Sequence, residues 1–555
     1  MKLSGADIIV RTLIEQGCKT VFGYPGGQIL NVYDSLYKYK DELNHVLTAH
    51  EQGAAHAADG YARATGKVGV VIATSGPGAT NLVTGIATAY LDSVPMVAIT
   101  GNVPSSQIGT DSFQEIDITG ITLPITKHNY FVGSVEELAD TIRDAFRLAA
   151  SGRPGPVLID VPKDIQIAKC EYTPKEVVSP DPKAPAKDIR ITEAAECINS
   201  AKRPFVYFGG GLISGEATEE MLDLAELIDA PIGCSMMGIS GVPTNHPRFL
   251  GMQGMHGHYA CSTAMHNADC IIALGVRFND RVTGNRAKFA KGAKIVHIDI
   301  DGAELSKTIP VAHGLRGDVK LTLQKLNSLI EKSSKPLWQK KIEELKQKEE
   351  QGSDKREGLT PANALKTLNN HLRPNTPVAT DVGQHQMWTA QYVKFENTRR
   401  FISSGGLGTM GFGIGAAIGA QMGSGEHTVL VTGDGSFGMC LQEMATAVSH
   451  KIPLVILILN NGVLGMVRQW QTLFFEKHYS NTVLDRKTNF VKLAEAFGAK
   501  GEAVFTVEEL DKALANAFAE NGPYLIDCAI DKDEFVLPML PPGGSMDDII
   551  TKIGD

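Results

Sequence analysis

The stretch from Thr428 to Gly462 decides the fold of this chain: TVLVTGDGSFGMCLQEMATAVSHKIPLVILILNNG. Two apolar segments, TVLVT and IPLVILIL, each end in a polar turn, GDG after the first and NN after the second. Apolar runs bounded by turn residues are typical of strands buried on both faces of a parallel sheet. The 24 residues between Gly435 and Asn460 leave room for a crossover helix. The stretch therefore predicts a strand–helix–strand unit of an α/β protein.

The two polar turns carry candidate ligands. Adjacent parallel strands end at the same edge of a sheet, so we expect Asp434 and Asn461 to lie close together. Both offer hard oxygen atoms, which Mg²⁺ prefers, and Mg²⁺ also binds phosphate oxygens. Gly435, Ser436 and Gly438 leave backbone N–H groups at a helix start, where a diphosphate can bind. A GDG turn alone is common, but GDG and NN at this spacing predict a metal and diphosphate site.

A second unit of the same kind lies near the N-terminus. A shift of 358 residues carries Thr74 onto Thr432 and aligns VIAT with VLVT, ATA with ATA and VPMV with IPLV without a gap. The same shift places Asn102 on Asn460. This register favours duplication over chance similarity. We therefore expect the first and third parts of the chain to be related, doubly wound domains.

Two linker-like segments divide the chain. The stretch 171–190 carries four prolines among charged residues, and the stretch 331–357 is rich in Lys and Glu around a short amphipathic piece. The first is typical of a linker and the second of a solvated helix that leads into a connector. The expected domains are 1–170, 190–335 and 360–540, with a C-terminal tail at 541–555.

Composition excludes several classes of protein. With 555 residues, 43% hydrophobic and 21% charged, the chain is globular. Its formal charge of −9 argues against a nucleic-acid partner. The longest strongly apolar run, Pro453 to Leu459, is too short to span a membrane. Eight cysteines without a CxxC pair, in a chain that begins with an amphipathic helix rather than a signal peptide, indicate the cytoplasm.

These motifs resemble a known family. GDG followed by 24 residues and NN resembles the motif of thiamine diphosphate-binding enzymes, and His50 to Ala54, HEQGA, resembles their catalytic-glutamate segment. Longer strings resemble one branch, the large catalytic subunit of acetohydroxyacid synthase (acetolactate synthase), from Leu3 to about Met546. These strings are VFGYPGGQILNVYD, HEQGAAHAADGYARATGK, TSGPGATN, SGRPGPVLIDVPKD, GMHG, RFNDRVTG and GMVRQWQ.

The resemblance implies an activity and an assembly. It implies an enzyme that decarboxylates pyruvate and transfers the two-carbon unit to pyruvate or 2-oxobutyrate, the first common step of branched-chain amino-acid biosynthesis. Thiamine diphosphate, Mg²⁺ and FAD are the implied cofactors. The first and third domains would bind the pyrimidine and the diphosphate, and a Rossmann-like middle domain would bind FAD. A homodimer or homotetramer would place Glu51 of one chain beside cofactor held by Asp434 of another, and a separate regulatory small subunit is also implied.

The resemblance also assigns residues, position by position. The implied catalytic residues are Gly27, Glu51, Phe113, Gln114 and Lys163, and the implied acceptor-substrate residues are Met255, Arg281 and Trp470. The implied thiamine diphosphate residues are Glu51, Gly383, Gln384, His385, Gly408, Met410, Gly433, Asp434, Gly435, Ser436, Asn461 and Met466. The implied FAD residues are Arg153, Gly209, Gly210, His256, Gly275, Arg277, Asp299, Ile300 and Asp318. The implied Mg²⁺ ligands are Asp434, Asn461 and the backbone carbonyl of Val463.

The sequence leaves some alternatives open. Asn279 departs from the family pattern RFDDR, a mild change beside the implied flavin contacts and Arg281. A flavin-reducing relative such as pyruvate oxidase shares the implied architecture, and flavin bleaching during anaerobic turnover with pyruvate would separate the two. A non-enzymatic relative would lack Glu51, Asp434 or Asn461, and all three are present. The C-terminal tail is either solvated or a lid over the active site.

Overall fold

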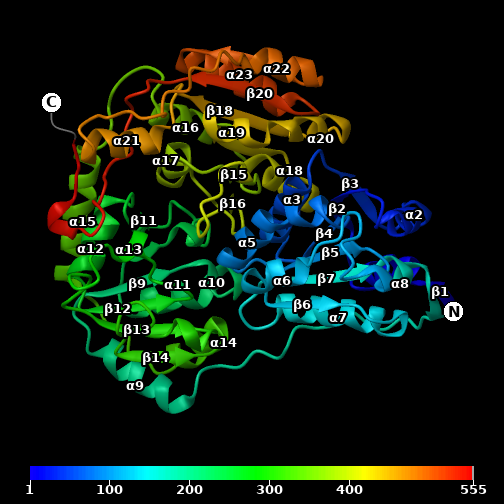
Figure 1. Cartoon of the computed structure of the whole chain (residues 1–555). Helices are drawn as coiled ribbons and strands as arrows, with labels where there is room; N and C mark the ends of the chain where they lie inside the picture. The colour runs from blue at the N-terminus through cyan, green and yellow to red at the C-terminus, as the bar shows by residue number, and fades with distance from the viewer. Residues whose placement is uncertain (553–555) are drawn as a thin grey trace.

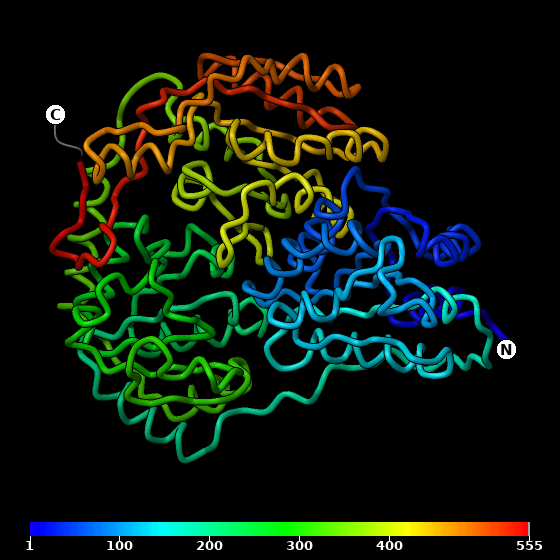
Figure 2. The backbone as a smooth tube through the Cα atoms, viewed as in Figure 1, coloured from blue at the N-terminus to red at the C-terminus, as the bar shows by residue number. Residues whose placement is uncertain are grey.

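The computed structural model describes residues 1–552, which form three α/β units (Figure 1). Each unit contains one six-stranded sheet in which every neighbouring pair of strands is parallel. Figure 2 shows the first unit in blue and cyan, the middle unit in green and the third unit from yellow to red. The predicted fold class of doubly wound, parallel α/β domains is confirmed.

The first unit has the strand order β3-β2-β4-β5-β7-β6. Its strands are β2 (Thr20–Tyr24), β3 (Asn44–Leu47), β4 (Gly69–Ala73), β5 (Met96–Asn102), β6 (His128–Phe131) and β7 (Pro156–Pro162). Its helices are α1 (Gly5–Glu15), α2 (Leu30–Lys38), α3 (Glu51–Thr65), α4 (Pro77–Asn81), α5 (Val83–Asp92), α6 (Ile118–Thr122), α7 (Val135–Ala150) and α8 (Lys163–Ile167). An antiparallel pair, β1 (Lys2–Ser4) and β8 (Lys169–Glu171), joins the two ends of this unit.

The middle unit has the order β11-β10-β9-β12-β13-β14. Its strands are β9 (Pro204–Phe208), β10 (Ile232–Cys234), β11 (Phe249–Met252), β12 (Cys270–Leu274), β13 (Lys294–Asp299) and β14 (His313–Arg316). Its helices are α9 (Asp188–Asn199), α10 (Gly210–Ser214), α11 (Thr218–Leu227), α12 (Tyr259–Asn267), α13 (Asp280–Thr283), α14 (Val319–Asn327) and α15 (Pro336–Gln351).

The third unit has the order β16-β15-β17-β18-β20-β19. Its strands are β15 (Val378–Thr380), β16 (Phe401–Ile402), β17 (Thr428–Gly433), β18 (Leu454–Asn460), β19 (Lys500–Val504) and β20 (Tyr524–Ala529). Its helices are α16 (Pro361–Asn369), α17 (Gln384–Tyr392), α18 (Phe412–Ser424), α19 (Asp434–Cys440), α20 (Met444–Ser449), α21 (Gly465–Phe474), α22 (Phe490–Phe497) and α23 (Val507–Ala519).

The first and third sheets share one topology. In both, the first strand in the sequence lies second in the sheet, and the last two strands in the sequence appear in the sheet in reversed order. β5 and β18 correspond residue for residue at the shift of 358 that the sequence predicts. The apolar side chains of β18 are buried up to its final asparagine, as expected for a strand covered on both faces. The structure therefore agrees with the predicted relation between these two parts.

Small residues hold the first and third units together within one chain. Helix α3 packs along α18 in the closest helix pair of the fold. A Cβ on Gly419 would lie 1.8 Å from the Ala57 carbonyl oxygen, and one on Gly60 would lie 2.0 Å from the Ala416 carbonyl oxygen. Only glycine permits so close an approach of two backbones. The contact therefore explains why both helices are rich in glycine and alanine.

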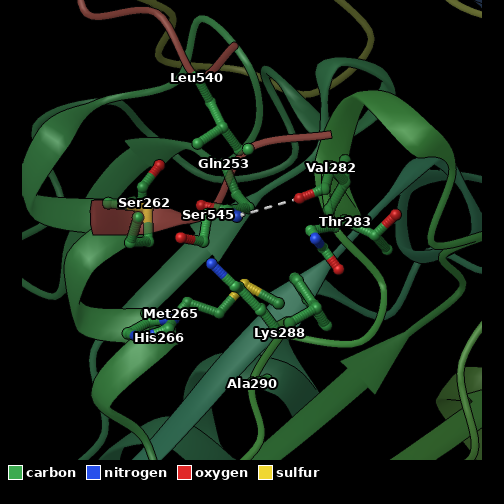
Figure 3. A pocket seen from close by; sticks show the side chains of 14 residues that line it. Gln253, Ser262, Met265, His266, Val282, Thr283, Lys288, Ala290, Leu540 and Ser545 are labelled. Carbon is green, nitrogen blue, oxygen red and sulfur yellow. Dashed lines mark hydrogen bonds between the residues drawn. The ribbon is translucent and has the colours of Figure 1, made fainter. Parts of the chain in front are cut away.

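The chain leaves the first unit through a long connector and ends on the middle unit. Residues 172–187 contain no helix or strand and run to α9, in line with the proline-rich sequence there (Figure 1). After β20 the chain crosses back to the middle unit, where the Leu540 N–H donates to the Met255 carbonyl at 2.7 Å. Figure 3 shows Leu540 and Ser545 beside Gln253 and Ser262 around a cavity of about 20 Å³. In the described part of the C-terminal segment, Gly544 to Met546 therefore pack against the middle unit, whereas Asp547, Asp548 and Lys552 are exposed.

None of the helices within residues 1–552 has the length and hydropathy that a membrane crossing requires.

Candidate active site and cofactor cavity

The two polar turns of the third unit meet at the carboxyl edge of its sheet. Asp434 is the first residue of α19, directly after β17, and Asn461 directly follows the neighbouring strand β18. The Gly462 N–H, near the Asp434 carboxylate, donates to Asn460 Oδ1 at 3.2 Å. The Asn461 amide donates to Gln384 Oε1 at 3.2 Å, and its oxygen accepts from the Val463 N–H at 3.2 Å. One carboxylate, one amide oxygen and a nearby backbone turn thus form an oxygen-rich site suited to Mg²⁺.

This site does not depend on a cluster of metal-binding side chains. Within residues 1–552, no group of three or more His, Cys, Asp or Glu side chains is arranged to hold a metal ion. Mg²⁺ usually keeps waters and substrate phosphates among its ligands and takes few protein donors. The pattern therefore fits a metal that is bound together with a diphosphate.

Burial makes the Asp434 carboxyl sensitive to pH. The residue is 8% exposed, and burial raises its pKa to about 6, against the opposing effect of backbone N–H groups such as that of Gly435. The carboxyl must lose its proton to bind a cation. Bound Mg²⁺ would supply the positive charge that favours the ionised form.

We expect Mg²⁺ to bind more weakly as pH falls through 6. Because the raised pKa leaves Asp434 protonated below that pH, the apparent affinity for Mg²⁺ with thiamine diphosphate should be roughly tenfold lower at pH 5 than at pH 8. Calorimetric titrations over this range would measure the change. A parallel pH series on Mg²⁺ and thiamine diphosphate without protein corrects for their own protonation, and a flat corrected profile would contradict the prediction.

A buried histidine lies beside the same turn. Burial lowers the pKa of His385 to about 3, so its ring is neutral, and its Nε2 atom has no hydrogen-bond partner among the described residues. A Cβ on Gly433 would lie 2.9 Å from His385 Nδ1, so the strand end must be glycine for the ring to fit. An unpaired buried ring nitrogen normally has a ligand as its partner. The chemistry of this pocket therefore fits a diphosphate group.

A cavity of about 1610 Å³ lies where the three units meet. The implied acceptor residues Met255, Arg281 and Trp470 all line it, as do Gly408 and Met466. The Arg281 guanidinium lies 5.8 Å from the centroid of the Trp470 ring, within range of a cation–π interaction, and its Nη1 is 3.8 Å from Met255 Sδ. Side chains from the middle and third units thus form one wall, with a guanidinium able to bind a carboxylate.

Another part of the cavity is lined by the middle unit together with Arg153 of the first unit. Eight of the nine implied flavin residues line it: Arg153, Gly210, His256, Gly275, Arg277, Asp299, Ile300 and Asp318. Gly209, the ninth, lies behind this wall, where its N–H donates to the Leu274 carbonyl.

The polar groups of this part of the cavity fit a dinucleotide. The Arg153 guanidinium donates to Glu304 Oε1 at 2.7 Å and to Asp301 Oδ2 at 3.2 Å, while Glu304 Oε2 is buried with no partner among the described residues. His256 Nδ1 is likewise buried without a partner, and burial lowers the pKa of His256 to about 4. Unpaired polar atoms around a cavity of this size are what a bound flavin dinucleotide would satisfy.

The five implied catalytic residues lie elsewhere, at the carboxyl edge of the first sheet. Gly27, Glu51 and Lys163 follow β2, β3 and β7, while Phe113 and Gln114 lie in the loop after β5. Lys163 Nζ donates to the Gly27 carbonyl at 3.1 Å.

Each of the other three has a defined setting. Asn81 Nδ2 donates to Glu51 Oε2 at 2.9 Å. Gln114 has a φ of 63° and packs against Gly76, and the Phe113 side chain is 83% exposed. These residues thus share the edge at which α/β sheets bind ligands.

In one chain the implied catalytic residues and the implied Mg²⁺ ligands lie at the carboxyl edges of two different sheets. Within residues 1–552, neither the five implied catalytic residues nor Asp434 and Asn461 belong to the lining of the large cavity. The third-unit residues that contact the start of α3 are Glu443 and Thr446, whose side-chain oxygens accept from the Ala49 N–H at 3.1 Å. Neither Asp434 nor Asn461 is a hydrogen-bonding partner of Glu51 in the part of the chain described.

Sequence reasoning did not single out several residues of these sites. Asn81 orients Glu51 and lies in TSGPGATN, a string already noted, so the motif contained a signal. Arg63 and Asp92 line the large cavity, as does Glu304, which binds Arg153. No local pattern marks Asp92 or Glu304, since their roles depend on contacts with other units.

Comparison with known proteins adds independent findings. Family profiles match at residues 3–121 (thiamine pyrophosphate enzyme, N-terminal TPP binding domain), 191–326 (central domain) and 381–528 (C-terminal TPP binding domain). The chain is 45% identical to a probable acetolactate synthase large subunit of Methanocaldococcus jannaschii, over 99% of this chain and 96% of the relative. It is 44% identical to the acetolactate synthase isozyme 3 large subunit of Escherichia coli (strain K12), over 99% and 98%. It is also 44% identical to the acetolactate synthase large subunit of Corynebacterium glutamicum, over 100% and 91%.

Proposed function

The chain belongs to the thiamine pyrophosphate enzyme family, among the acetolactate synthase large subunits, and we propose that its active site is completed between two chains. It is a thiamine diphosphate-dependent acetolactate synthase of branched-chain amino-acid biosynthesis, with Mg²⁺ and FAD as its further cofactors. The proposal rests on the placement of Glu51 and Asp434 at the carboxyl edges of two different sheets, with no hydrogen bond from Glu51 to Asp434 or Asn461 among the described residues. The named relatives are synthases rather than pyruvate oxidases, which favours the carboligase over the flavin-reducing alternative.

The third unit would hold the diphosphate end of the cofactor. In this proposal Asp434, Asn461 and the Val463 carbonyl bind Mg²⁺, and Gln384 and His385 contact the diphosphate together with the backbone of α19. The remaining contacts come from residues at the same sheet edge and on the cavity wall: Gly383, Gly408, Met410, Gly433, Gly435, Ser436 and Met466. When bound, thiamine diphosphate supplies the nucleophilic carbon and the electron sink for decarboxylation.

The first unit of the partner chain would supply the proton chemistry. The Glu51 carboxylate, oriented by Asn81, would hold and transfer a proton at the pyrimidine end of the cofactor. Gln114 donates a hydrogen bond to the reacting substrate, and Phe113 provides an apolar wall that excludes water. Gly27 and Lys163, joined by a hydrogen bond, stand at the substrate entrance. Exposure of Phe113 in the single chain supports this proposal, because a large exposed aromatic side chain is typical of an interface.

The acceptor 2-oxo acid would bind against Arg281 and Trp470. The guanidinium clamps the acceptor carboxylate, and the indole ring shapes the space for its alkyl group. Met255 fixes the position of Arg281, since the Met255 N–H donates to the Arg281 carbonyl at 2.7 Å. The Asn279 side chain caps α13 by accepting from the Val282 N–H at 3.2 Å, so it orients the helix that carries Arg281.

We expect Trp470→Leu to change the product ratio. The smaller side chain enlarges the pocket, and apolar pockets discriminate by about 1–3 kcal/mol per methylene, so the ratio of acetohydroxybutyrate to acetolactate should shift about tenfold or more. Product analysis with equal pyruvate and 2-oxobutyrate measures it. Phe474→Leu is the matched control, because Phe474 stacks edge-on to Trp470 at 5.7 Å but does not line the cavity. An unchanged ratio, or acetolactate formed without thiamine diphosphate and Mg²⁺, would refute the assignment.

The subunit composition, the cellular location and the domain boundaries are also proposals. The large-subunit relatives support a regulatory small subunit. A homodimer or homotetramer of this chain is proposed as well. The cytoplasm remains the proposed location. The proposed domains bind the pyrimidine at 1–170, FAD at 190–335 and the diphosphate at 360–540, followed by the segment 541–555.

A further inference from the structure

A buried carboxylate of the first unit binds the backbone of a third-unit loop. Asp92 is the last residue of α5, and its side chain is fully buried. Its two oxygens accept from the Gly405 N–H at 3.0 Å and from the Gly406 N–H at 2.7 Å. Both glycines belong to the loop 403–411, which joins β16 to α18 and carries Gly408 and Met410. The loop is therefore positioned by a residue that lies more than 300 positions earlier in the sequence.

Arg63 extends this contact to both ends of the loop. Its Nη2 donates to Asp92 Oδ2 at 2.9 Å, and its Nη1 donates to the Ser403 carbonyl at 2.9 Å. Its guanidinium also lies 5.4 Å from the centroid of the Phe412 ring, at the far end of the loop. A second carboxylate, Asp59, also forms an ion pair with Arg63. The pair of Arg63 and Asp92 thus contacts the loop at its start and near its middle, and Arg63 also contacts Phe412 just after its end.

The same pair faces the flavin end of the large cavity. Arg63 and Asp92 line that cavity with Arg277 and the glycines Gly405, Gly406 and Gly408. The Arg277 guanidinium is 4.0 Å from Asp92 Oδ1. The Arg277 side chain is 30% exposed, and its partial burial lowers its pKa. A ligand that orders Arg277 therefore also acts on the carboxylate that holds the loop.

We propose that Asp92 is a positioning residue that couples flavin binding to thiamine diphosphate binding through the loop 403–411. The inference rests on the proposed assignment of Gly408 and Met410 to the thiamine diphosphate site. A flavin in the cavity orders Arg277 against Asp92, and the ordered carboxylate holds the loop in its binding conformation. Coupling of this kind is reciprocal, so each cofactor tightens the other by the same factor. It gives the flavin a role that needs no electron transfer.

Titration of thiamine diphosphate with Mg²⁺ into flavin-free and flavin-loaded protein tests the coupling. We expect the flavin-loaded wild type to bind thiamine diphosphate about 5–150-fold more tightly. In Asp92→Asn this ratio should fall toward one, because the amide keeps one acceptor oxygen but loses the charge that faces Arg63 and Arg277. Asp229→Asn is the control: it removes the charge that pairs with Arg248 at 2.9 Å in the middle unit, outside the cavity lining, and should keep the wild-type ratio at saturating flavin.

A second measurement needs no variant. Hydrogen exchange at the Gly405 and Gly406 amides of the wild type should slow when FAD alone is added, because these N–H groups are the ones that Asp92 binds. Unchanged exchange, or equal thiamine diphosphate affinity with and without flavin in an active enzyme, would overturn the coupling alone. Failure of the flavin-loaded wild type to bind thiamine diphosphate would overturn the proposed function and this inference with it.

Discussion

Glu51→Gln should bind thiamine diphosphate almost as tightly as the wild type and yet lose about 10²–10⁴-fold in kcat. The amide has the shape of the carboxylate and can still bond to Asn81, but it cannot take up or release the proton in the same way. The proposed contacts to the diphosphate come from the third unit and would be unaffected. Steady-state acetolactate formation and calorimetric cofactor titration measure the two effects separately.

Glu42→Gln provides the matched control for this substitution. Glu42 is a half-exposed carboxylate of the same unit, paired with Arg11 at 3.1 Å, and its loss should leave both quantities unchanged. A Glu51→Gln enzyme with normal turnover would disprove the catalytic role. A variant that loses cofactor affinity to the same extent as turnover would instead assign Glu51 a binding role.

Heterodimers that combine Glu51→Gln with Asp434→Ala should regain about half of the wild-type rate per dimer, although each homodimer is nearly inactive. Asp434→Ala removes the charged Mg²⁺ ligand, so it should abolish metal-dependent cofactor binding. If Glu51 of one chain serves cofactor held by the other, the mixed dimer contains one intact site and one doubly altered site. Coexpression with two affinity tags isolates this species for assay.

The reciprocal pairing separates the two arrangements further. A heterodimer of wild type with the double variant Glu51→Gln/Asp434→Ala has no intact site when sites form between chains, but it keeps one when each chain builds its own. We therefore expect this species to be inactive. Activity in it, with no recovery in the first heterodimer, would show that the two half-sites meet within one chain.

Local sequence was sufficient to predict the chemistry of the third sheet edge. β17 and β18 are short, apolar and close in the sequence, so their parallel pairing and the placement of Asp434 beside the Asn461 turn follow from rules that involve neighbouring residues only. The shift of 358 predicted the matching strands β5 and β18 for the same reason: a strand is specified by its own apolar run and its own turn.

Contacts between units were not predictable in this way. Arg281 and Trp470 were named separately, from a family resemblance, and nothing in either segment shows that one lies over the other. The same is true of Asp92, which has no motif around it and acquires its role from two amides of a distant loop. For the C-terminal segment the sequence left open a solvated tail or a lid. In the structure the chain contacts the middle unit where this segment begins, through Leu540 and Met255.

The sequence by itself determined the α/β class, the repeated topology and the residues that can bind a metal-held diphosphate, because each depends on periodicity and spacing within about 35 residues. Only the tertiary structure decided that one wall of the large cavity combines the middle and third units, with Arg281 beside Trp470. The physical reason is close packing. The relative placement of the units depends on contacts such as that between α3 and α18, where glycines let the two backbones touch. Such a contact requires two distant segments with complementary surfaces, so neither segment predicts it alone.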